Sequence, residues 1–293
     1  MKLIDGKAIA EEIRKEIAAE VAAMIDGGLP APHLAAILVG EDPASMTYVT
    51  NKEKDCKACG IISSIYRLSE TTTEKTILEL VDFLNKDIEV DGFIVQLPLP
   101  AHIQVSKVIE SINPAKDVDG FHPVNLGRMM INLPSYLPAT PYGIVEMIRR
   151  SKIDTEGKHC VVIGRSNIVG TPVSVLLSRN TNPGNCTVTL CHSKTQDLKE
   201  ICLTADILIA AIGKHDFVTA DMIREGAVVI DVGMNRIESS KTASGFRLAG
   251  DVKFDEVSKK CSYITPVPGG VGPMTRIGLL TNTLKAAKKE IFI

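Results

Sequence analysis

The stretch Gly164–Gly170, with the sequence GRSNIVG, decides the fold of the second half of this chain. It follows an apolar run, Cys160–Ile163, and leads into Thr171-Pro172 and a further apolar segment. That order predicts a buried strand, a tight glycine turn and the start of a helix. Such a turn points free backbone N–H groups and the positive end of a helix dipole at one place, where an anion binds.

The turn departs from the usual dinucleotide fingerprint G-x-G-x-x-G, because Ser166 stands at the second glycine and the last glycine comes one residue late. Two features nevertheless favour a nucleotide. Arg165 places a cation inside the turn, and the segment Cys191–Thr195 (CHSKT) offers no Asp or Glu to the ribose hydroxyls. Cationic and hydroxyl side chains suit a ribose 2′-phosphate, so we predict NADP rather than NAD. An ordinary strand–turn–helix connection without a ligand is the alternative.

The composition indicates a globular chain of nearly neutral charge. Of its 293 residues 45% are hydrophobic, and the formal net charge is −2. This length suffices for one large or two medium domains with a sizeable core. No Lys/Arg run indicates a nucleic-acid-binding face, and no apolar run reaches transmembrane length. The start of the chain, Met1–Gly6, lacks the apolar core of a signal peptide, so we expect a cytoplasmic protein without membrane or nucleic-acid partners.

The seven cysteines are scattered along the chain, as in a reduced intracellular protein. The only C-x-x-C pair, Cys56 and Cys59, is expected at the end of a helix just before Gly60. There the helix dipole disfavours a thiolate, and no second Cys or His pair completes a zinc site. We therefore expect ordinary helical positions and no metal.

Strands and helices alternate along both halves of the chain. Strands are expected at residues 34–39, 61–66, 92–97, 160–163, 187–190, 207–211, 227–231 and, more weakly, 262–265. Helices are expected at residues 7–24, 43–60, 73–84, 104–109 and 140–148, from residue 171, and at 275–289. Residues 111–138 are expected to be irregular, and residues 269–273 to form a hinge-like turn. The alternation predicts an α/β fold with mostly parallel sheets, and two such sheets side by side form a cleft that suits a ligand.

Tyr48 and Lys52 are four residues apart, so they share one face of the helix expected after Asp42. Desolvation in a cleft lowers the preference of a lysine for its charged form, which lets it give and take protons near neutral pH. A surface lysine beside a half-buried tyrosine is the alternative, and on spacing alone it is the more common case.

Polar residues also follow the strand expected at 92–97. Gln96 stands at its carboxyl end, where ligands meet open α/β sheets, and its amide offers both a donor and an acceptor. Local hydrogen bonding is the alternative for this residue. The segment Lys116–Gly120 adds two carboxylates, Asp117 and Asp119, that suit a base, a metal ligand or an acceptor for a nitrogen-rich ring. A plain Asp-Gly turn is the alternative, and it is favoured on these residues alone.

Two further segments are candidates for ligand contact. Pro266–Thr275, with the sequence PVPGGVGPMT, is dense in residues that fix or free the backbone, so its main chain can come close to a ligand. A plain interdomain hinge is the alternative. Asp231–Asn235 ends another expected strand and is a candidate to border the nicotinamide.

Taken in order, these motifs resemble those of the bifunctional methylenetetrahydrofolate dehydrogenase/cyclohydrolase family over nearly the whole chain. The motifs that carry the resemblance are Tyr48-x-x-x-Lys52, Asp91–Pro100 (DGFIVQLPLP), Lys116–Gly120 (KDVDG), Gly164–Gly170, His192–Thr195 (HSKT), Asp231–Gly233 and Pro266–Thr275. The long proline-rich motifs are specific, and their agreement in order is not expected by chance.

The resemblance implies two reactions in one cleft. A hydride passes from 5,10-methylenetetrahydrofolate to NADP⁺, and water then converts the methenyl product to 10-formyltetrahydrofolate. It also implies a folate-binding catalytic domain of residues 1–142 and 273–293, and a Rossmann-type NADP-binding domain of residues 143–272. By analogy with the family, we expect a homodimer that pairs through the cofactor domain.

The resemblance assigns roles to individual residues. Lys52 is the central catalytic group, Tyr48 stacks on the folate, Gln96 supports the lysine, and Asp119 holds the pterin ring. The segment Pro268–Arg276 lines the folate site, and Arg165 and Ser193 hold the 2′-phosphate. The full substrate-binding set is Tyr48, Lys52, Val95, Gln96, Leu97, Asp119, Pro268, Gly269, Gly270, Val271, Gly272 and Pro273. The cofactor-binding set is Gly164, Arg165, Ser166, Ile168, Ser193 and Met234.

Three alternatives stay open at this point. The first is a different Rossmann oxidoreductase with the same two-domain plan, such as a shikimate-type dehydrogenase, which would not need Tyr48, Lys52, Gln96 and Asp119 together. The second is a nucleotide-binding protein without catalysis, against which the intact lysine set argues. The third is a family member that keeps only the dehydrogenase.

Overall fold

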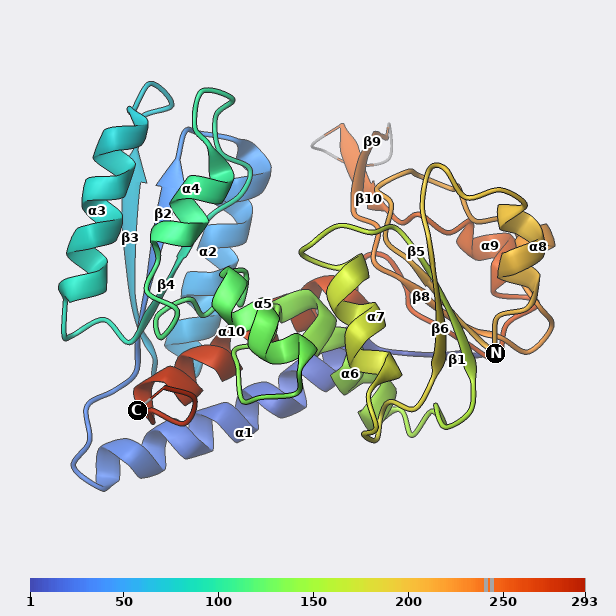
Figure 1. Ribbon diagram of the computed structural model, residues 1–293, viewed down its shortest axis with the longest axis horizontal. Helices are drawn as coiled ribbons and strands as arrows, with labels where there is room; N and C mark the ends of the chain where they lie inside the picture. The colour runs from blue at the N-terminus through green and yellow to red at the C-terminus, as the bar shows by residue number, and fades with distance from the viewer. Residues whose placement is uncertain (240–241, 243–244, 293) are drawn as a thin grey trace. The chain divides into compact units, whose positions relative to one another are not determined.

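The computed structural model describes residues 1–239, 242 and 245–292, and the chain divides into two compact units. Unit 1 consists of Met1–Ala10 and Thr140–Thr275, and unit 2 consists of Glu11–Ala139 and Arg276–Ile293. The chain passes between the units within three helices, α1 (Gly6–Asp26), α6 (Ala139–Arg150) and α10 (Val271–Ala287) (Figure 1).

Unit 1 contains a six-stranded parallel sheet with the strand order β1-β11-β8-β7-β5-β6. The strands are β1 (Lys2–Leu3), β5 (His159–Ile163), β6 (Thr187–Cys191), β7 (Ile207–Ala210), β8 (Val228–Asp231) and β11 (Tyr263–Ile264). The central strands β5, β7 and β8 are almost wholly apolar and buried, as expected where helices cover both faces of a parallel sheet.

Helices pack on both faces of the unit 1 sheet. On one side, Val161, Leu208 and Val229 form a buried core with residues of α8 (Leu198–Leu203) and α9 (Phe254–Val257) and with Met222 at the end of the short helix η1 (Ala220–Met222). Figure 1 shows α7 (Gly170–Ser178) on the other side of the same sheet.

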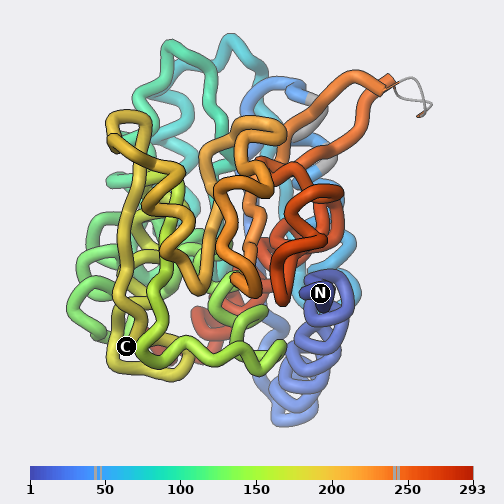
Figure 2. Tube along the Cα trace, turned by 90° about the vertical axis from the view of Figure 1, so that its right-hand side faces the viewer, coloured from blue at the N-terminus to red at the C-terminus, as the bar shows by residue number. Residues whose placement is uncertain are grey.

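An antiparallel hairpin, which the sequence analysis does not anticipate, also belongs to unit 1. It pairs β9 (Asn235–Glu238) with β10 (Phe246–Ala249), and the Arg236 guanidinium lies 4.0 Å from the centre of the Phe246 ring. In Figure 2 this orange hairpin extends away from the rest of its unit.

Unit 2 contains a three-stranded parallel sheet with the order β3-β2-β4. Its strands are β2 (His33–Val39), β3 (Ile62–Leu68) and β4 (Gly92–Val95), and its helices include α2 (Pro43–Ala58), α3 (Glu74–Lys86), α4 (Val105–Ser111) and α5 (Pro123–Met130). One face of the sheet, with Ile37 and Phe93, packs against α3 and α4. Figure 1 shows α2 and α3 on opposite sides of this sheet.

The predicted α/β fold with parallel sheets is confirmed, and two local predictions are wrong. The segment 111–138 is not wholly irregular, because it contains α5, where His122 Nδ1 accepts a hydrogen bond from Val124 N–H and Pro123 starts the helix. The last helix begins at Val271 rather than Thr275, so residues 271–273 of the expected hinge at 269–273 are helical. Pro273 is compatible with this early start because the first turn needs no N–H donor.

The division into units differs from the predicted domain boundaries, because unit 1 also includes residues 1–10, 140–142 and 273–275. Lys2 and Leu3 pair with Tyr263 and Ile264 of β11, and Lys7 N–H donates to Gly269 O at 2.9 Å. The amino terminus is therefore part of the unit 1 sheet. The functional boundaries of the folate-binding and NADP-binding domains stay a prediction.

The seven cysteines are all buried and free, as their apolar surroundings in the sequence indicate. Burial raises the pKa of Cys56 to about 12 and that of Cys59 to about 11. Both thiols lie at the end of α2 and are protonated at neutral pH, so the C-x-x-C pair occupies ordinary helical positions.

Within the part of the chain that the structure describes, no helix combines the length and the apolar character needed to cross a membrane. No cluster of three or more His, Cys, Asp or Glu side chains among the same residues is arranged to hold a metal ion.

Candidate active site

The helix α2 presents the lysine and tyrosine of the predicted site on one face. Asp42 caps the helix, because its Oδ2 accepts from Ser45 N–H at 2.7 Å, and Pro43 occupies the first turn. The predicted Asp-Pro start of the helix is thus confirmed. Tyr48 and Lys52 follow later in the same helix, so the start of α2 at Asp42 fixes the positions of both residues along the helix.

Gln96 binds the lysine directly. Lys52 Nζ donates a hydrogen bond to Gln96 Oε1 at 3.1 Å, and Gln96 Nε2 donates to Leu97 O at 2.7 Å. The Gln96 backbone N–H donates to Ile37 O at 2.9 Å, which extends the β2–β4 pairing by one residue. Both ends of the amide are therefore held, and the oxygen faces the lysine. Val95 is the buried last residue of β4, and Leu97 is half-buried.

Asp119 is the charged neighbour of Lys52. Burial lowers the pKa of Lys52, and the Asp119 carboxylate acts in the opposite direction. Burial also raises the pKa of Asp119, and the lysine opposes that rise. Each group thus keeps its partner closer to the charged form than burial alone would.

The loop that carries Asp119 is fixed to the sheet. Phe93 N–H donates to Lys116 O at 2.9 Å, and Asn282 Nδ2 of α10 donates to Val118 O at 2.9 Å. A Cβ on Gly92 would lie 2.2 Å from Val118 Cγ1, so only glycine allows this approach of the loop to β4.

The two aspartates of the Lys116–Gly120 segment have different surroundings. Asp117 is buried, and its carboxylate accepts from His122 N–H at 2.8 Å and from Asn125 Nδ2 at 2.9 Å. Asp117 therefore stabilises the turn before α5, whereas Asp119 is the one that interacts with Lys52. The sequence offers both as candidates, and the structure separates them.

Tyr48 is half-buried on α2. Burial raises the pKa of its hydroxyl, while the Arg276 cation lowers it. The hydroxyl is therefore protonated at neutral pH.

The sequence gives no separate role to the charged side chains around the face of α2 that carries Tyr48 and Lys52. Asp55 lies on the same helix and binds Arg14 of α1 and Arg276 of α10. The position of Asp55, three residues after Lys52, was the available signal for it. Arg276 is predicted from the sequence only as the last residue of the segment Pro268–Arg276.

The turn Gly164–Gly170 has the close backbone approach expected of an anion-binding turn. Gly164 has φ 117°, and a Cβ there would lie 2.1 Å from Ala211 O. A Cβ on Gly170 would lie 1.9 Å from Gly164 O, so the start of α7 folds tightly onto the end of β5. The tight positions of the turn are therefore its first and last residues, and Ser166 stands at neither of them.

The side chains of this turn are available to a ligand. Arg165, Ser166 and Ile168 are exposed, and Ser166 Oγ accepts from Val169 N–H at 3.2 Å. Ser193 is also exposed and lies two residues beyond Cys191, just as Arg165 lies two residues beyond Ile163. Since Ile163 and Cys191 are paired across β5 and β6, the cation and the hydroxyl extend from neighbouring strand ends. This arrangement fits the phosphate of a nucleotide.

Met234 and the glycine-rich segment Pro268–Pro273 both belong to unit 1. Met234 lies three residues after β8, and its Cε is 3.5 Å from where a Cβ on Gly272 would be. Gly269 has φ 107°, and a Cβ on Gly270 would lie 2.5 Å from Pro266 O. The structure thus brings a predicted cofactor contact and part of the predicted substrate segment together. Lys52, Tyr48, Gln96 and Asp119 belong to unit 2.

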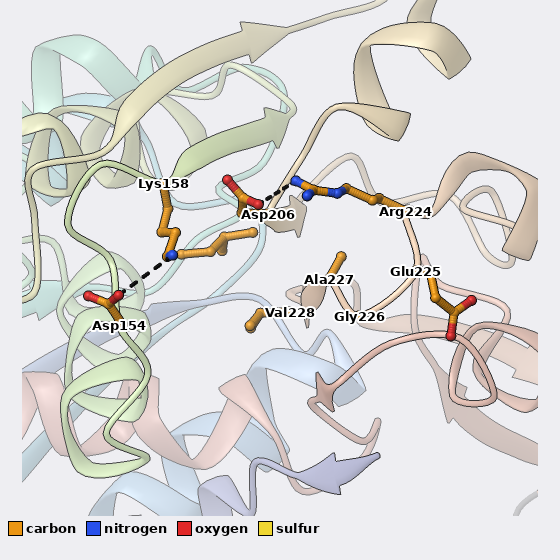
Figure 3. A pocket seen from close by; sticks show the side chains of 9 residues that line it. Asp154, Lys158, Asp206, Arg224, Glu225, Gly226, Ala227 and Val228 are labelled. Atoms are coloured by element: carbon orange, nitrogen blue, oxygen red, sulfur yellow. Dashed lines mark hydrogen bonds and ion pairs between the residues drawn. The ribbon is translucent and has the colours of Figure 1, made fainter.

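A polar cavity of about 210 Å³ lies at the other ends of the unit 1 strands from the glycine turn (Figure 3). Its lining includes the first residues of β7 and β8, so it is at the amino ends of the strands. Lys158 pairs with Asp154, and Arg224 pairs with Asp206. These charges neutralise one another, and the cavity is separate from the glycine turn.

The fold and these two groups of residues define a class: α/β enzymes with a dinucleotide-binding unit and a second unit that carries a half-buried lysine. The chain matches two family descriptions, "Tetrahydrofolate dehydrogenase/cyclohydrolase, catalytic domain" over residues 4–119 and "Tetrahydrofolate dehydrogenase/cyclohydrolase, NAD(P)-binding domain" over residues 138–291. It therefore belongs to the tetrahydrofolate dehydrogenase/cyclohydrolase family.

Relatives of known name agree with this assignment along the whole chain. "Bifunctional protein FolD" of Cytophaga hutchinsonii is 59% identical and covers 98% of this chain and 99% of its own length. The crystal structure of the FolD methylenetetrahydrofolate dehydrogenase/cyclohydrolase from Campylobacter jejuni is 47% identical with a TM-score of 0.92 and covers 99% of each chain. The Trypanosoma brucei enzyme, solved in complex with NADP and an inhibitor, is 39% identical with a TM-score of 0.93 and covers 99% of this chain and 98% of its own. The family match decides against the alternative of a different Rossmann dehydrogenase.

Proposed function

We propose that Lys52 is the proton-transferring group of the hydrolytic reaction and that the strand ends of unit 1 hold NADP. The chain is a bifunctional enzyme of folate one-carbon metabolism. It oxidises 5,10-methylenetetrahydrofolate to 5,10-methenyltetrahydrofolate with NADP⁺ and hydrolyses this product to 10-formyltetrahydrofolate. The observation that carries the residue assignment is the contact of Lys52 Nζ with Gln96 Oε1 beside Asp119.

The cofactor side follows from the geometry of the Gly164–Gly170 turn. The backbone of the turn and the start of α7 would hold the pyrophosphate, and Arg165 and Ser193 would hold the 2′-phosphate. Met234 would lie beside the nicotinamide. When bound, NADP⁺ supplies the hydride acceptor, and hydride transfer itself needs position rather than a side-chain base.

The hydrolytic reaction needs a group that can accept a proton and return it. Because its ammonium form is disfavoured by burial, Lys52 can take a proton from the water that attacks the methenyl carbon. The same proton can then reach the ring nitrogen as the C–N bond breaks. Gln96 would orient the amine, Tyr48 would stack on the pteridine ring, and Asp119 would accept from its N–H groups.

The remaining substrate contacts are proposed for two stretches of chain, one around Gln96 and the other the glycine-rich segment Pro268–Pro273. Val95 and Leu97 flank Gln96, and Pro268, Gly269, Gly270, Val271, Gly272 and Pro273 bring the backbone close to the folate. The small side chains of the second group fit a flat ring against the main chain.

A two-step assay tests the proposed function. Purified enzyme is given 5,10-methylenetetrahydrofolate with NADP⁺ or NAD⁺, and both reduced nucleotide and 10-formyltetrahydrofolate are measured. We expect both products, with NADP⁺ strongly preferred. Accumulation of methenyltetrahydrofolate alone would indicate a dehydrogenase without the second activity. Binding of NADP without turnover would indicate a non-catalytic protein.

We also propose a cytoplasmic homodimer whose only substrates are small molecules. A nearly neutral charge and the absence of Lys/Arg blocks favour neither nucleic acid nor membrane surfaces. Within unit 1, β6 is an edge strand of the sheet, and an edge strand offers free backbone groups to a second copy. Light scattering coupled to size-exclusion chromatography tests the dimer, and a monomeric mass at micromolar concentration would contradict it.

A further inference from the structure

Four side chains of alternating charge form a series of ion pairs across three helices of unit 2. Arg14 of α1 binds Glu11 one turn earlier, and its Nη2 lies 3.0 Å from Asp55 Oδ1 on α2. The other oxygen of Asp55, Oδ2, lies 2.7 Å from Arg276 Nε on α10. The last member of the series is therefore the Arg276 cation.

Asp55 lies on the same face of α2 as the site residues. It follows Lys52 by three positions and Tyr48 by seven, which is the spacing of one helical stripe. Its side chain is only 11% exposed, and each of its oxygens faces a different arginine. Asp55 therefore attracts the Arg276 cation to this face of α2 by charge.

Arg276 meets α2 at Asp55, which lies on the same helical face as Lys52 and one turn after it. Its side chain is 23% exposed, so its field is only partly screened by water. Burial is the largest influence on both groups, raising the pKa of Tyr48 and lowering that of Lys52, and the Arg276 cation acts to lower both. The other titratable groups that act on Lys52 are Asp119 and Cys56, and both work in the opposite direction.

We propose that Arg276 is a positioning residue for Lys52: clamped by Asp55, it fixes a positive charge that favours the neutral amine over the ammonium form. This role differs from lining the folate site, because it operates before any ligand is bound. It rests on the proposed function only in the catalytic use of Lys52.

The pH dependence of methenyltetrahydrofolate hydrolysis tests this proposal. If the neutral amine is the active form, activity rises with pH as Lys52 loses its proton. Arg276→Gln removes the cation, so the pKa of Lys52 rises and the acidic limb moves to higher pH. Arg276→Lys keeps the charge and is expected to restore most of the wild-type position. If the glutamine variant does not fold, Arg276→Met keeps the aliphatic stem and replaces it.

Arg14→Gln is the matched control, because it removes an ion pair with the same carboxylate from another helix. It is expected to lower stability without moving the acidic limb. If the acidic limb moved equally in Arg14→Gln and Arg276→Gln, the proposal would be overturned, because breaking either ion pair of Asp55 would then be enough to shift the pH profile.

A direct titration separates this proposal from the proposed function. The pKa of the Lys52 amine is measured by NMR on protein with isotope-labelled lysine, and Lys52→Met assigns the signal. We expect a higher pKa in Arg276→Gln than in the wild type, whether or not the enzyme hydrolyses methenyltetrahydrofolate. An unchanged pKa would show that Asp55 and Arg276 serve only to join α2 and α10.

Discussion

The segment β2–α2–β3–α3–β4 of unit 2 and the segment β5–α7–β6–α8–β7 of unit 1 have the same strand order and the same register. In each, the first strand lies between the other two. His33 pairs with the first residue of β3, and His159 pairs with the first residue of β6. The following residue, Leu34 or Cys160, pairs with the first residue of β4 or β7.

The same polar contacts fix the start of both first strands. His33 Nε2 and Ser64 Oγ of β3 are 2.8 Å apart, as are His159 Nε2 and Thr189 Oγ1 of β6. The backbone N–H of each histidine donates to the aspartate before the third strand, at 2.8 Å for Asp91 in unit 2 and 2.9 Å for the corresponding residue in unit 1. A histidine is thus used twice as a structural clamp, which explains why neither belongs to the site.

The two cores differ at the carboxyl ends of their strands. Gly40 and Gly164 follow the first strand, and each donates its N–H to the last residue of the neighbouring strand at 2.9 Å. The helix then begins at Pro43 in unit 2 but at Gly170 in unit 1. After the third strand, Gln96 occupies the position that Ala211 has in unit 1, since each donates its N–H to the first strand. The same β-α-β-α-β arrangement therefore carries the Lys52–Gln96 pair in unit 2 and the glycine turn Gly164–Gly170 in unit 1.

The largest expected effect concerns the helix of unit 2. Lys52→Met removes the only proton-transferring amine proposed for the hydrolytic reaction, so its rate should fall about 10²–10⁴-fold. Circular dichroism should show an intact fold, because the side chain is only half-buried. Lys54→Met, at an exposed position of the same helix, is the control and should keep the wild-type rate. Hydrolysis at the wild-type rate in Lys52→Met would refute the assignment.

The two equivalent glycines should differ in their tolerance of a side chain. Both have positive φ, which costs an alanine about 1–2 kcal/mol. A Cβ on Gly40 would meet Glu70 Cβ at 3.6 Å, an ordinary contact, whereas a Cβ on Gly164 would meet Ala211 O at 2.1 Å. Gly164→Ala should therefore be clearly less stable than Gly40→Ala in urea denaturation. Equal midpoints would mean that the turn of unit 1 is no tighter than its counterpart.

The cation in the turn of unit 1 should set nucleotide preference. Arg165→Ala removes a charge-assisted contact with the 2′-phosphate, so KM for NADP⁺ should rise about 10- to 100-fold. The reaction with NAD⁺, which lacks that phosphate, should change little. Steady-state kinetics with both nucleotides measure the two values on one preparation. A parallel loss with NADP⁺ and NAD⁺ would place Arg165 outside the phosphate contact.

The smallest effect tests whether the two histidine clamps are equivalent. Ser64→Ala and Thr189→Val each remove the hydroxyl that faces the histidine, and each should cost about 1 kcal/mol of unfolding free energy. Chemical denaturation of both variants measures the costs, and activity should be retained because the clamps lie at the amino ends of the strands. A large cost in one unit and none in the other would argue against a shared core.

The sequence by itself determined the local elements of this protein. The Asp42-Pro43 cap, the shared face of Tyr48 and Lys52, and the strand–turn–helix at Gly164 depend on residues within one or two turns of each other, so the pattern of neighbours specifies them. The family motifs, read in order, extended these local predictions to the enzyme class.

Only the tertiary structure decided which of the distant candidates share a site. In it, Asp119 interacts electrostatically with Lys52, whereas Asp117 accepts a hydrogen bond in the turn before α5. Asp55 forms an ion pair with Arg276. The tertiary structure also paired β1 with β11, at the far end of the chain. Parallel pairing and helix packing bring together residues that are far apart in the sequence, and nothing in their immediate neighbours records the partner.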